Sequence, residues 1–267
     1  MLPDKALPNG LLPGVWPKHW PVAFMPGSLP MGGLVAMTPI HAFSSAPVPL
    51  QIQRQPQLNP QRHDIDLGYS LAFVIDDVVT AREADTIVEA SERFGYRDEA
   101  PGICTPPGMR MNKSVHWVSD TALTEPLFTR IAHLLPQRID GAQLHAGFSQ
   151  RFNMYRYDAE DVFNRHTDGS WPGYGLSPDR TQMIQWPTNI RSALTMLLYL
   201  NGSADGVKGG NTRLFDVDGE AIDVVPTKGS ALFFRHGFGA DSVMHEGCRV
   251  SGNVAKYVAR INVMYAA

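Results

Sequence analysis

Hydrophobic residues recur at helical spacing in two stretches of the first half of the chain. The first stretch begins at Thr80-Ala-Arg-Glu83, which has the form of a capping box, and one of its faces then carries Ala84, Ile87, Val88 and Ser91. The second covers about 124–135, with Thr124 before Pro126 at its start and Leu127, Ile131, Leu134 and Leu135 at helical spacing. A strand-like run from Tyr69 to Ile75 precedes both predicted helices.

After His145 the pattern changes to short apolar runs separated by turns. Gly209-Gly210-Asn211 and Lys228-Gly229 are typical turn segments. The runs predict strands at about 148–157, 191–200, 211–216, 221–225, 230–235 and 255–265. Helices first and then many strands predict a mainly β fold, in which two sheets form a sandwich and the helices support one outer face.

Residues 1–60 hold more than half of the 21 prolines. Prolines this frequent argue against long helices and central strands. The segment also carries apolar residues such as Trp16, Trp20 and Phe24, so we expect a Pro-rich arm packed over a domain of residues 61–267. An oligomerisation strap that makes a homodimer is the alternative.

Charge and cysteine content exclude some classes of function. The net charge of −3 and the pI near 6.3 provide no basic surface for nucleic acid. Cys104 and Cys248 lack CxxC spacing and predict neither a zinc site nor a disulfide framework, which favours a reducing compartment. The sequence has no run of 18 or more apolar residues, which argues against a membrane span. We therefore expect a soluble, cytoplasmic protein.

Candidate chemistry centres on His166-Thr-Asp168 and the distant His245. Side chains at i and i+2 of a strand end point the same way, so His166 and Asp168 can share one metal ion. Two imidazoles and one carboxylate make the facial triad of non-haem Fe(II) oxygenases, which leaves positions open for a co-substrate and dioxygen. Either histidine taken alone is better explained as a surface histidine, and only the combination favours a metal site.

The last predicted strand divides by alternation into two faces. One face is apolar, with Tyr257, Ala259, Ile261 and Val263, and the other carries Lys256, Val258, Arg260 and Asn262. Buried charges need partners, and an anionic co-substrate would provide one. An edge strand with its cations in solvent is the alternative. Tyr155, Tyr157 and Tyr199 lie on other strand faces, where their hydroxyls could bind a carboxylate or simply belong to the aromatic core.

The C-terminal half resembles the prolyl 4-hydroxylase-like branch of the Fe(II)/2-oxoglutarate dioxygenases. The resemblance covers about 148–265 and preserves the order of the family's sequence blocks. These blocks are Tyr155-Arg-Tyr157, His166-Thr-Asp168-Gly169, Leu197-Leu-Tyr-Leu-Asn201, Gly209-Gly-Asn-Thr212, Gly229-Ser-Ala-Leu-Phe233, His245-Glu-Gly247 and Gly252-Asn-Val-Ala-Lys-Tyr257 with the strand to Tyr265.

This resemblance implies a double-stranded β-helix, or jelly-roll, with iron bound by His166, Asp168 and His245. It implies 2-oxoglutarate and dioxygen as co-substrates, with ascorbate as an optional addition, and coupled decarboxylation and C–H hydroxylation. Lys256 would bind the distal carboxylate of 2-oxoglutarate, with Arg260 as a competitor on the same face. The tyrosines Tyr157, Tyr199 and Tyr155 would help to hold the co-substrate.

The Gly- and Pro-rich stretch after the iron motif, residues 170–188, is predicted to be a lid that carries substrate-binding residues. Candidates in it are Trp171, Tyr174, Arg180 and Gln182, and Arg110 with Asn112 could also line the mouth of the site. An ordinary packed loop is the alternative for these residues.

Three functions compete. The first is hydroxylation of a peptidyl or free amino acid, proline-like, or of another small molecule. The second is nucleic-acid dealkylation by the same iron chemistry, which the acidic balance opposes. The third is a non-catalytic jelly-roll binding module, which would not need an intact set of metal ligands.

Overall fold

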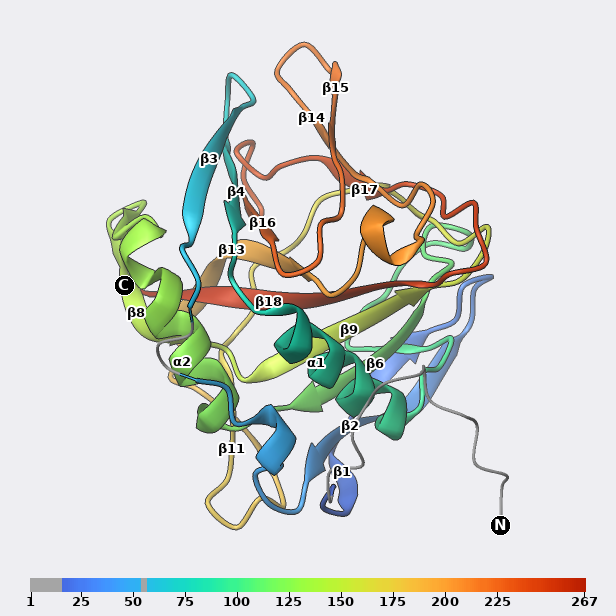
Figure 1. The fold of residues 1–267 in the computed structure, drawn as a ribbon, viewed down its shortest axis with the longest axis vertical. Helices are drawn as coiled ribbons and strands as arrows, with labels where there is room; N and C mark the ends of the chain where they lie inside the picture. The colour runs from blue at the N-terminus through green and yellow to red at the C-terminus, as the bar shows by residue number, and fades with distance from the viewer. Residues whose placement is uncertain (1–15, 54–56) are drawn as a thin grey trace.

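Strands of the C-terminal half alternate between two sheets in the computed structural model, which describes residues 16–53 and 57–267 (Figure 1). Within the 12-stranded main sheet, the order β16-β13-β18-β9 joins Ala231–Arg235, Ile190–Tyr199, Lys256–Ala266 and Arg151–Tyr157. The 4-stranded second sheet, in the order β10-β17-β14-β15, joins Phe163–His166, His245–Gly247, Thr212–Phe215 and Ala221–Val224. All neighbours in these two runs are antiparallel, and side chains of both sheets pack in one buried cluster. The predicted jelly-roll is confirmed.

The main sheet continues on both sides of this core. Beyond β16 it adds β4 (Leu71–Asp76) and then β3 (Gln61–Asp66). Beyond β9 it adds β6 (Lys113–Val118), β2 (Leu34–Phe43), β1 (His19–Ser28) and β5 (Ala100–Pro101). The short strand β7 (Arg138–Ile139) pairs with β8 (Ala142–Phe148), and β8 pairs with β18. Because β18 lies between β13 and β9, the alternative of an edge strand for Lys256 and Arg260 is wrong.

The proline-rich N-terminal segment enters this sheet. β2 lies between β6 and β1, so the expectation that prolines exclude interior strands is wrong for this segment. Register shifts between Pro21 and Ala23 and between Met25 and Gly27 absorb the missing donors of Pro21 and Pro26. Residues 1–15 and 54–56 lie outside the described residues, and the predicted division at residue 60 stays a prediction.

Two helices cover the outer face of the main sheet (Figure 1). α1 (Ala81–Phe94) has the predicted capping box between Thr80 and Glu83. α2 (Thr121–Ile131) begins earlier than predicted, because Asp120 caps it by accepting from Ala122 N, and Pro126 lies inside the helix. Short 3-10 turns occupy Val48–Leu50, Ala132–Leu134 and Ser203–Asp205. In the described ranges, none of the helices has the length and apolarity needed to cross a bilayer.

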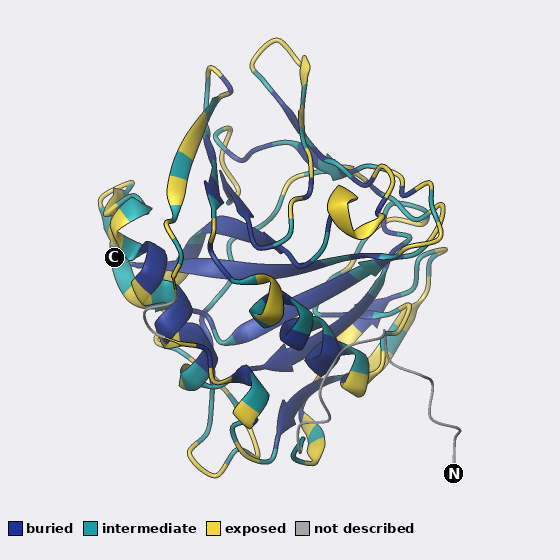
Figure 2. Ribbon diagram, in the orientation of Figure 1, coloured by how far each residue is buried: buried dark blue, intermediate teal, exposed yellow. Residues whose placement is uncertain are grey.

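The core between helices and sheet is the most buried part of the molecule (Figure 2). From β18 it receives Ala259, Ile261 and Val263, which are the apolar face predicted for this strand. The opposite face of β18 therefore points toward the second sheet, where Val258 belongs to a separate buried cluster. Alternation along one strand thus separates the structural core from the polar interior of the jelly-roll.

Residues 170–188, predicted to be a lid, contain a hairpin instead of an irregular loop. β11 (Tyr174–Leu176) pairs with β12 (Met183–Gln185) as a separate 2-stranded sheet. Leu176 and Met183 pack on a cluster of β1, β2 and β6 that contains Val22, Ile40, Ala42 and Val118. The hairpin therefore covers the inner face of the N-terminal part of the main sheet.

Candidate metal centre

Three potential metal ligands meet where the second sheet opens. β10 ends at His166, β17 begins at His245, and these two residues are paired across the sheet. Asp168, two residues after His166 in the sequence, is the third member of the group. One ligand atom of each of the three lies within 4.8 Å of the others, so a single ion can bind between them.

Backbone carbonyls orient both histidines. Nδ1 of His166 lies 2.7 Å from Asn164 O, and Nδ1 of His245 lies 3.1 Å from Val243 O. Because a carbonyl only accepts, each Nδ1 carries the proton and each Nε2 presents its lone pair to the centre. Burial lowers the pKa of His166 and lowers the pKa of His245 to about 3, so both rings are neutral at physiological pH and ready to bind a metal.

Both oxygens of Asp168 face the histidines, and one of them is also held by hydrogen bonds. Oδ1 lies 3.9 Å from His166 Nε2, and Oδ2 lies 3.9 Å from His245 Nε2. Oδ2 accepts from Thr195 Oγ1 at 2.6 Å and from Arg260 Nε at 2.9 Å. Burial alone would raise the pKa of Asp168, but Arg260 and the neighbouring histidines hold it well below its usual range. The donor set of two neutral imidazoles and one carboxylate fits Fe(II).

A directed hydrogen-bond chain supports Asp168 from behind. Thr195 Oγ1 gives its proton to Asp168, so it accepts from His236 Nδ1 at 2.7 Å. His236 Nε2 then accepts from Ser192 Oγ at 2.7 Å, and Ser192 Oγ accepts from Trp171 N. Burial lowers the pKa of His236 to about 3, which keeps this ring neutral. The sequence pattern did not predict this series of hydrogen bonds.

Aromatic rings restrict the two imidazoles further. The ring of Phe163 stacks on His166 with centroids 3.7 Å apart, and Phe234 lies 4.3 Å from His245. Such packing locks the side-chain rotamers of the ligands before any ion binds.

A buried cavity extends from this centre along the interior of the jelly-roll. Lys256 and Arg260 line it together with Tyr155, Tyr157, Leu197, Thr212 and Val258.

Lys256 Nζ donates to Gly210 O at 2.5 Å and lies 5.0 Å and 5.6 Å from the ring centroids of Tyr157 and Tyr199. Tyr199 donates its hydroxyl proton to Thr212 Oγ1. Burial lowers the pKa of Lys256 to about 8, and among the described residues no carboxylate pairs with it.

Gly210 leaves space for the side chain of Lys256. Gly210 has φ +69°, and a Cβ there would lie 3.0 Å from Lys256 Cδ. The left-handed backbone turns the Gly210 carbonyl to the lysine, which explains one use of the predicted Gly209-Gly210 turn.

The predicted substrate residues do not line this cavity. Arg110 is fully buried and donates to the carbonyls of Asn112, Ser28 and Asp98. Arg180 donates to Phe43 O and Asp120 Oδ2, which ties the β11–β12 hairpin to β2 and α2. Trp171 lies over the guanidinium of Arg151. Substrate roles for Trp171, Arg180 and Arg110 stay predictions.

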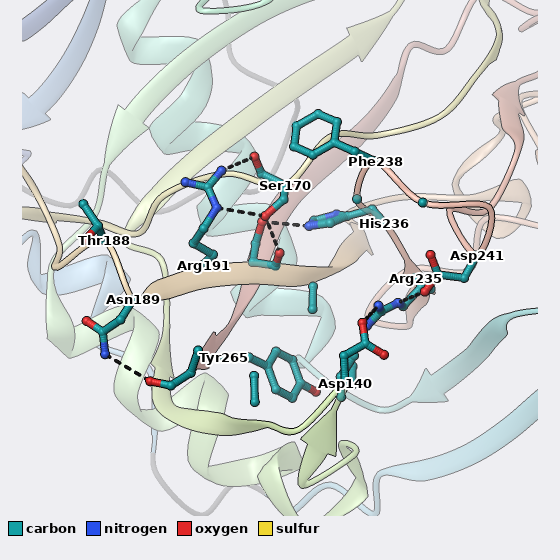
Figure 3. Close-up of a pocket in the computed structure, with 17 residues that line it drawn as sticks. Asp140, Ser170, Thr188, Asn189, Arg191, Arg235, His236, Phe238, Asp241 and Tyr265 are labelled. Atoms are coloured by element: carbon teal, nitrogen blue, oxygen red, sulfur yellow. Dashed lines mark hydrogen bonds and ion pairs between the residues drawn. The ribbon is translucent and has the colours of Figure 1, made fainter.

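A second cavity of about 400 Å³ lies on the other side of the hydrogen-bond chain (Figure 3). Ser170, Ser192 and His236 line it, and Phe238, which is 86% exposed, stands at its edge. Arg235 at this cavity pairs with the exposed carboxylates of Asp140 and Asp241. Ser192 and His236 of the hydrogen-bond chain therefore separate this cavity from Asp168, which is not among its lining residues.

Residues 152–264 match the family model of the 2OG-Fe(II) oxygenase superfamily. No curated protein matches the chain. A prolyl hydroxylase from Trichoplax adhaerens, solved with a hypoxia inducible factor oxygen degradation domain peptide fragment, has a TM-score of 0.51 at 16% identity, covering 73% of this chain and 83% of that chain.

Two further solved structures are similar. The viral collagen prolyl hydroxylase of Paramecium Bursaria Chlorella virus-1, in complex with 2OG, has a TM-score of 0.49 at 16% identity over 73% of this chain and 96% of that chain. A Pseudomonas putida prolyl-4-hydroxylase has a TM-score of 0.48 at 17% identity over 75% and 95%. The Trichoplax likeness shows the shared fold, and the family match shows that residues 152–264 form a 2OG-Fe(II) oxygenase domain.

Proposed function

We propose that this chain, which carries a 2OG-Fe(II) oxygenase domain over residues 152–264, hydroxylates a C–H bond of a free or peptidyl amino acid or another small molecule. It would convert 2-oxoglutarate to succinate and carbon dioxide in the same cycle. The observation that carries the proposal is the convergence of His166, Asp168 and His245 beside a cavity that ends in a buried lysine.

These three residues would hold the iron. Bound Fe(II) would supply open coordination positions at which 2-oxoglutarate and dioxygen react. The protein's own contribution is to keep both imidazoles neutral, to keep Asp168 ionised and to exclude water from a dry, shaped interior. The hydrogen bonds and ring stacks described above support the first two of these tasks.

Lys256 is our proposal for the residue that binds the distal carboxylate of 2-oxoglutarate. Arg260 competes for this role from the same face of β18, but its Nε is committed to Asp168. Lys256 lies deeper along the cavity, between the rings of Tyr157 and Tyr199, and a carboxylate would offset the cost of burying its charge. Tyr155, Tyr157 and Tyr199 would shape the pocket around the co-substrate.

The proposed substrate can be a peptide as well as a small molecule, since the Trichoplax enzyme of the same fold was solved with a peptide fragment. Nucleic acid is not favoured, because the net charge of the chain is −3. The two free cysteines, Cys104 and Cys248, favour a reducing compartment such as the cytoplasm.

A homodimer through the N-terminal segment is a further part of the proposal. Exposed apolar side chains gather on and between β1 and β2, namely Phe24, Met31, Leu34 and Met37. Apolar patches of this kind are typical of interaction surfaces. Light scattering on the full chain tests it, and replacement of Leu34 and Met37 by Ser should then yield a monomer.

Turnover of 2-oxoglutarate tests the proposed function. Purified protein with Fe(II) should release succinate, and the correct substrate should stimulate the release. His166→Ala and Asp168→Ala should abolish turnover while the fold persists. Succinate release that is absent in the wild-type protein, or unchanged in both variants, would contradict the proposal.

A further inference from the structure

Buried polar side chains cross the inner face of the main sheet next to the metal centre. His116 on β6 pairs with Asn153 on β9, and Asn153 pairs with Arg260 on β18. Arg151 and Asn262 lie two residues further along the same strand faces. These five residues, here called the polar row, are each no more than 6% exposed.

Each side chain of the polar row has an atom without a hydrogen-bond partner in the part of the chain that the structure describes. These atoms are His116 Nε2, Arg151 Nε, Asn153 Oδ1, Arg260 Nη2 and Asn262 Oδ1. Native proteins leave few buried polar atoms unsatisfied, and each such atom calls for a partner that the fold itself does not supply. A group of them on neighbouring strand positions beside a metal centre is typical of a binding site.

Several of these atoms are donors. Arg151 Nη2 lies 2.9 Å from His116 Nδ1, and an arginine only donates, so His116 Nδ1 accepts and its proton resides on Nε2. Burial, with the nearby Arg151, lowers the pKa of His116 well below its usual range, which keeps this single tautomer. Three N–H groups of the polar row therefore lack hydrogen-bond acceptors, namely those of Arg151 Nε, His116 Nε2 and Arg260 Nη2.

The charge of the polar row is also unbalanced. Arg151 contacts Pro101 O, His116 Nδ1 and Met25 Sδ, and over residues 16–53 and 57–267 it has no carboxylate partner. Arg260 has Asp168, but that carboxylate is also a proposed iron ligand. Two buried guanidinium groups thus share a single negative charge. A buried cation is costly unless an anion pairs with it.

We infer that the polar row binds a carboxylate of the substrate, and that the hydroxylated compound is a small molecule with a free carboxyl group, such as a free amino acid. This inference rests on the hydroxylase function proposed above and narrows its substrate class. The carboxylate accepts from Arg151, His116 and Arg260, which places the rest of the molecule beside Asp168. The unpartnered Oδ1 atoms of Asn153 and Asn262 provide acceptors for a polar group such as an amine.

The cover over the polar row is the segment between the iron motif and the β11–β12 hairpin. The Arg151 guanidinium lies 5.4 Å from the ring centroid of Trp171 and 5.5 Å from that of Tyr174. β11 and β12 hydrogen-bond as strands only to each other within the described residues. The backbone of Tyr174 is hydrogen-bonded to Ser149 and Gln150, so substrate entry requires a movement of the Trp171 and Tyr174 rings. A carboxylate that reaches Arg151 then replaces these cation–π contacts with an ion pair.

Binding to the full chain tests this inference without turnover. The protein is loaded with Mn(II) and 2-oxoglutarate and titrated with free L-amino acids and small aliphatic and 2-hydroxy carboxylic acids, each compared with its primary amide. Intrinsic fluorescence reports binding, because Trp171 covers the site. At least one acid should bind, and its amide should bind about 10- to 100-fold more weakly, since a hydrogen-bonded charge is lost.

Variants of the protein test whether Arg151 is the residue that binds the carboxylate. Arg151→Gln should bring the affinity of the acid down to that of the amide and leave the affinity for 2-oxoglutarate unchanged. Arg249→Gln is the matched control, because Arg249 pairs with Glu160 on the surface and its side chain is 60% exposed. If Arg151→Gln does not fold, the comparison of acid and amide in the wild-type protein still shows whether a substrate carboxylate is recognised.

Three outcomes overturn the inference. Amides or capped peptides that bind as tightly as the acids would show that no carboxylate is recognised. A panel in which no acid binds would show the same. A loss of 2-oxoglutarate affinity in Arg151→Gln would assign the cation to the co-substrate instead. Iron-dependent succinate release, measured separately, distinguishes these outcomes from a failure of the proposed hydroxylase function.

Discussion

Arg260 Nε donates to Asp168 Oδ2 at 2.9 Å, so a buried cation on the last strand fixes the carboxylate that faces the two histidines. Arg260 and Asp168 are separated by most of the jelly-roll sequence, and only the pairing of β18 within the main sheet brings them together. The contact connects the polar face of β18 to the metal centre. It also explains why the carboxylate stays ionised in a dry interior.

Replacement of Arg260 by Met should weaken metal binding. The substitution keeps the length of the side chain but removes the charge that lowers the pKa of Asp168, and loss of such a supporting contact costs about 10- to 100-fold in metal affinity. Competition between Mn(II) and a fluorescent chelator measures the effect, with Arg249→Gln as a surface control. Unchanged metal affinity together with a large rise in the Kd for 2-oxoglutarate would instead make Arg260 the co-substrate residue.

The affinity for 2-oxoglutarate should depend on pH through Lys256. Burial lowers the pKa of Lys256 to about 8, and only the protonated lysine attracts a carboxylate. Below pH 8 the cation is present and the Kd should be flat; above pH 8 the Kd should rise about tenfold for each pH unit, because the protein must take up a proton to bind. Titration calorimetry of the Mn(II)-loaded protein at several pH values measures this.

Lys256→Arg provides the control for this pH dependence. An arginine stays charged throughout the range, so the variant should bind 2-oxoglutarate with little change in Kd above pH 8. An identical alkaline rise in wild type and variant would show that another group titrates.

His236 should act as a positioning residue for Asp168. Its Nδ1–H holds Thr195 Oγ1, which in turn donates to Asp168. His236→Leu removes this support and leaves Ser192 and Thr195 without their partner, so metal affinity should fall about 10- to 100-fold. His236→Gln, which can still donate one hydrogen bond and accept another, should recover part of the loss. Equal metal affinity in wild type, Leu and Gln variants would exclude the role.

Periodicity along single strands predicted much of the site. The two faces of β18 and the common side of His166 and Asp168 follow from a repeat of two, which needs no tertiary information. The position of His245 opposite His166 depends on the register between β10 and β17, which local pattern does not encode. The support of Asp168 by Thr195 and His236 was missed for the same reason, because it joins β13 to the end of β16.

The missed strands have other physical causes. β3 (Gln61–Asp66) is an edge strand whose residues are exposed or half-buried, so it has no apolar alternation to detect. β1 contains Pro21 and Pro26, and the irregular register that accommodates them is a property of its pairing with β2. α2 starts earlier than its hydrophobic pattern predicts, because Asp120 caps the helix and Pro126 lies inside it and not in its first turn.

A last prediction concerns the close approach of Gly247 to Tyr157. A Cβ at Gly247 would lie 2.9 Å from Tyr157 Oη and 3.2 Å from its ring, and this ring forms one wall beside Lys256. Gly247→Ala should therefore push Tyr157 from its position, reduce stability by about 1–3 kcal/mol, and raise the Kd for 2-oxoglutarate more than it lowers metal affinity. Thermal unfolding and calorimetry measure the two effects. Gly147→Ala is the matched control, because a Cβ there meets nothing within 4 Å. If Gly247→Ala binds 2-oxoglutarate as the wild type does, Tyr157 does not shape the co-substrate pocket, and the cavity wall beside Lys256 must tolerate displacement of this ring.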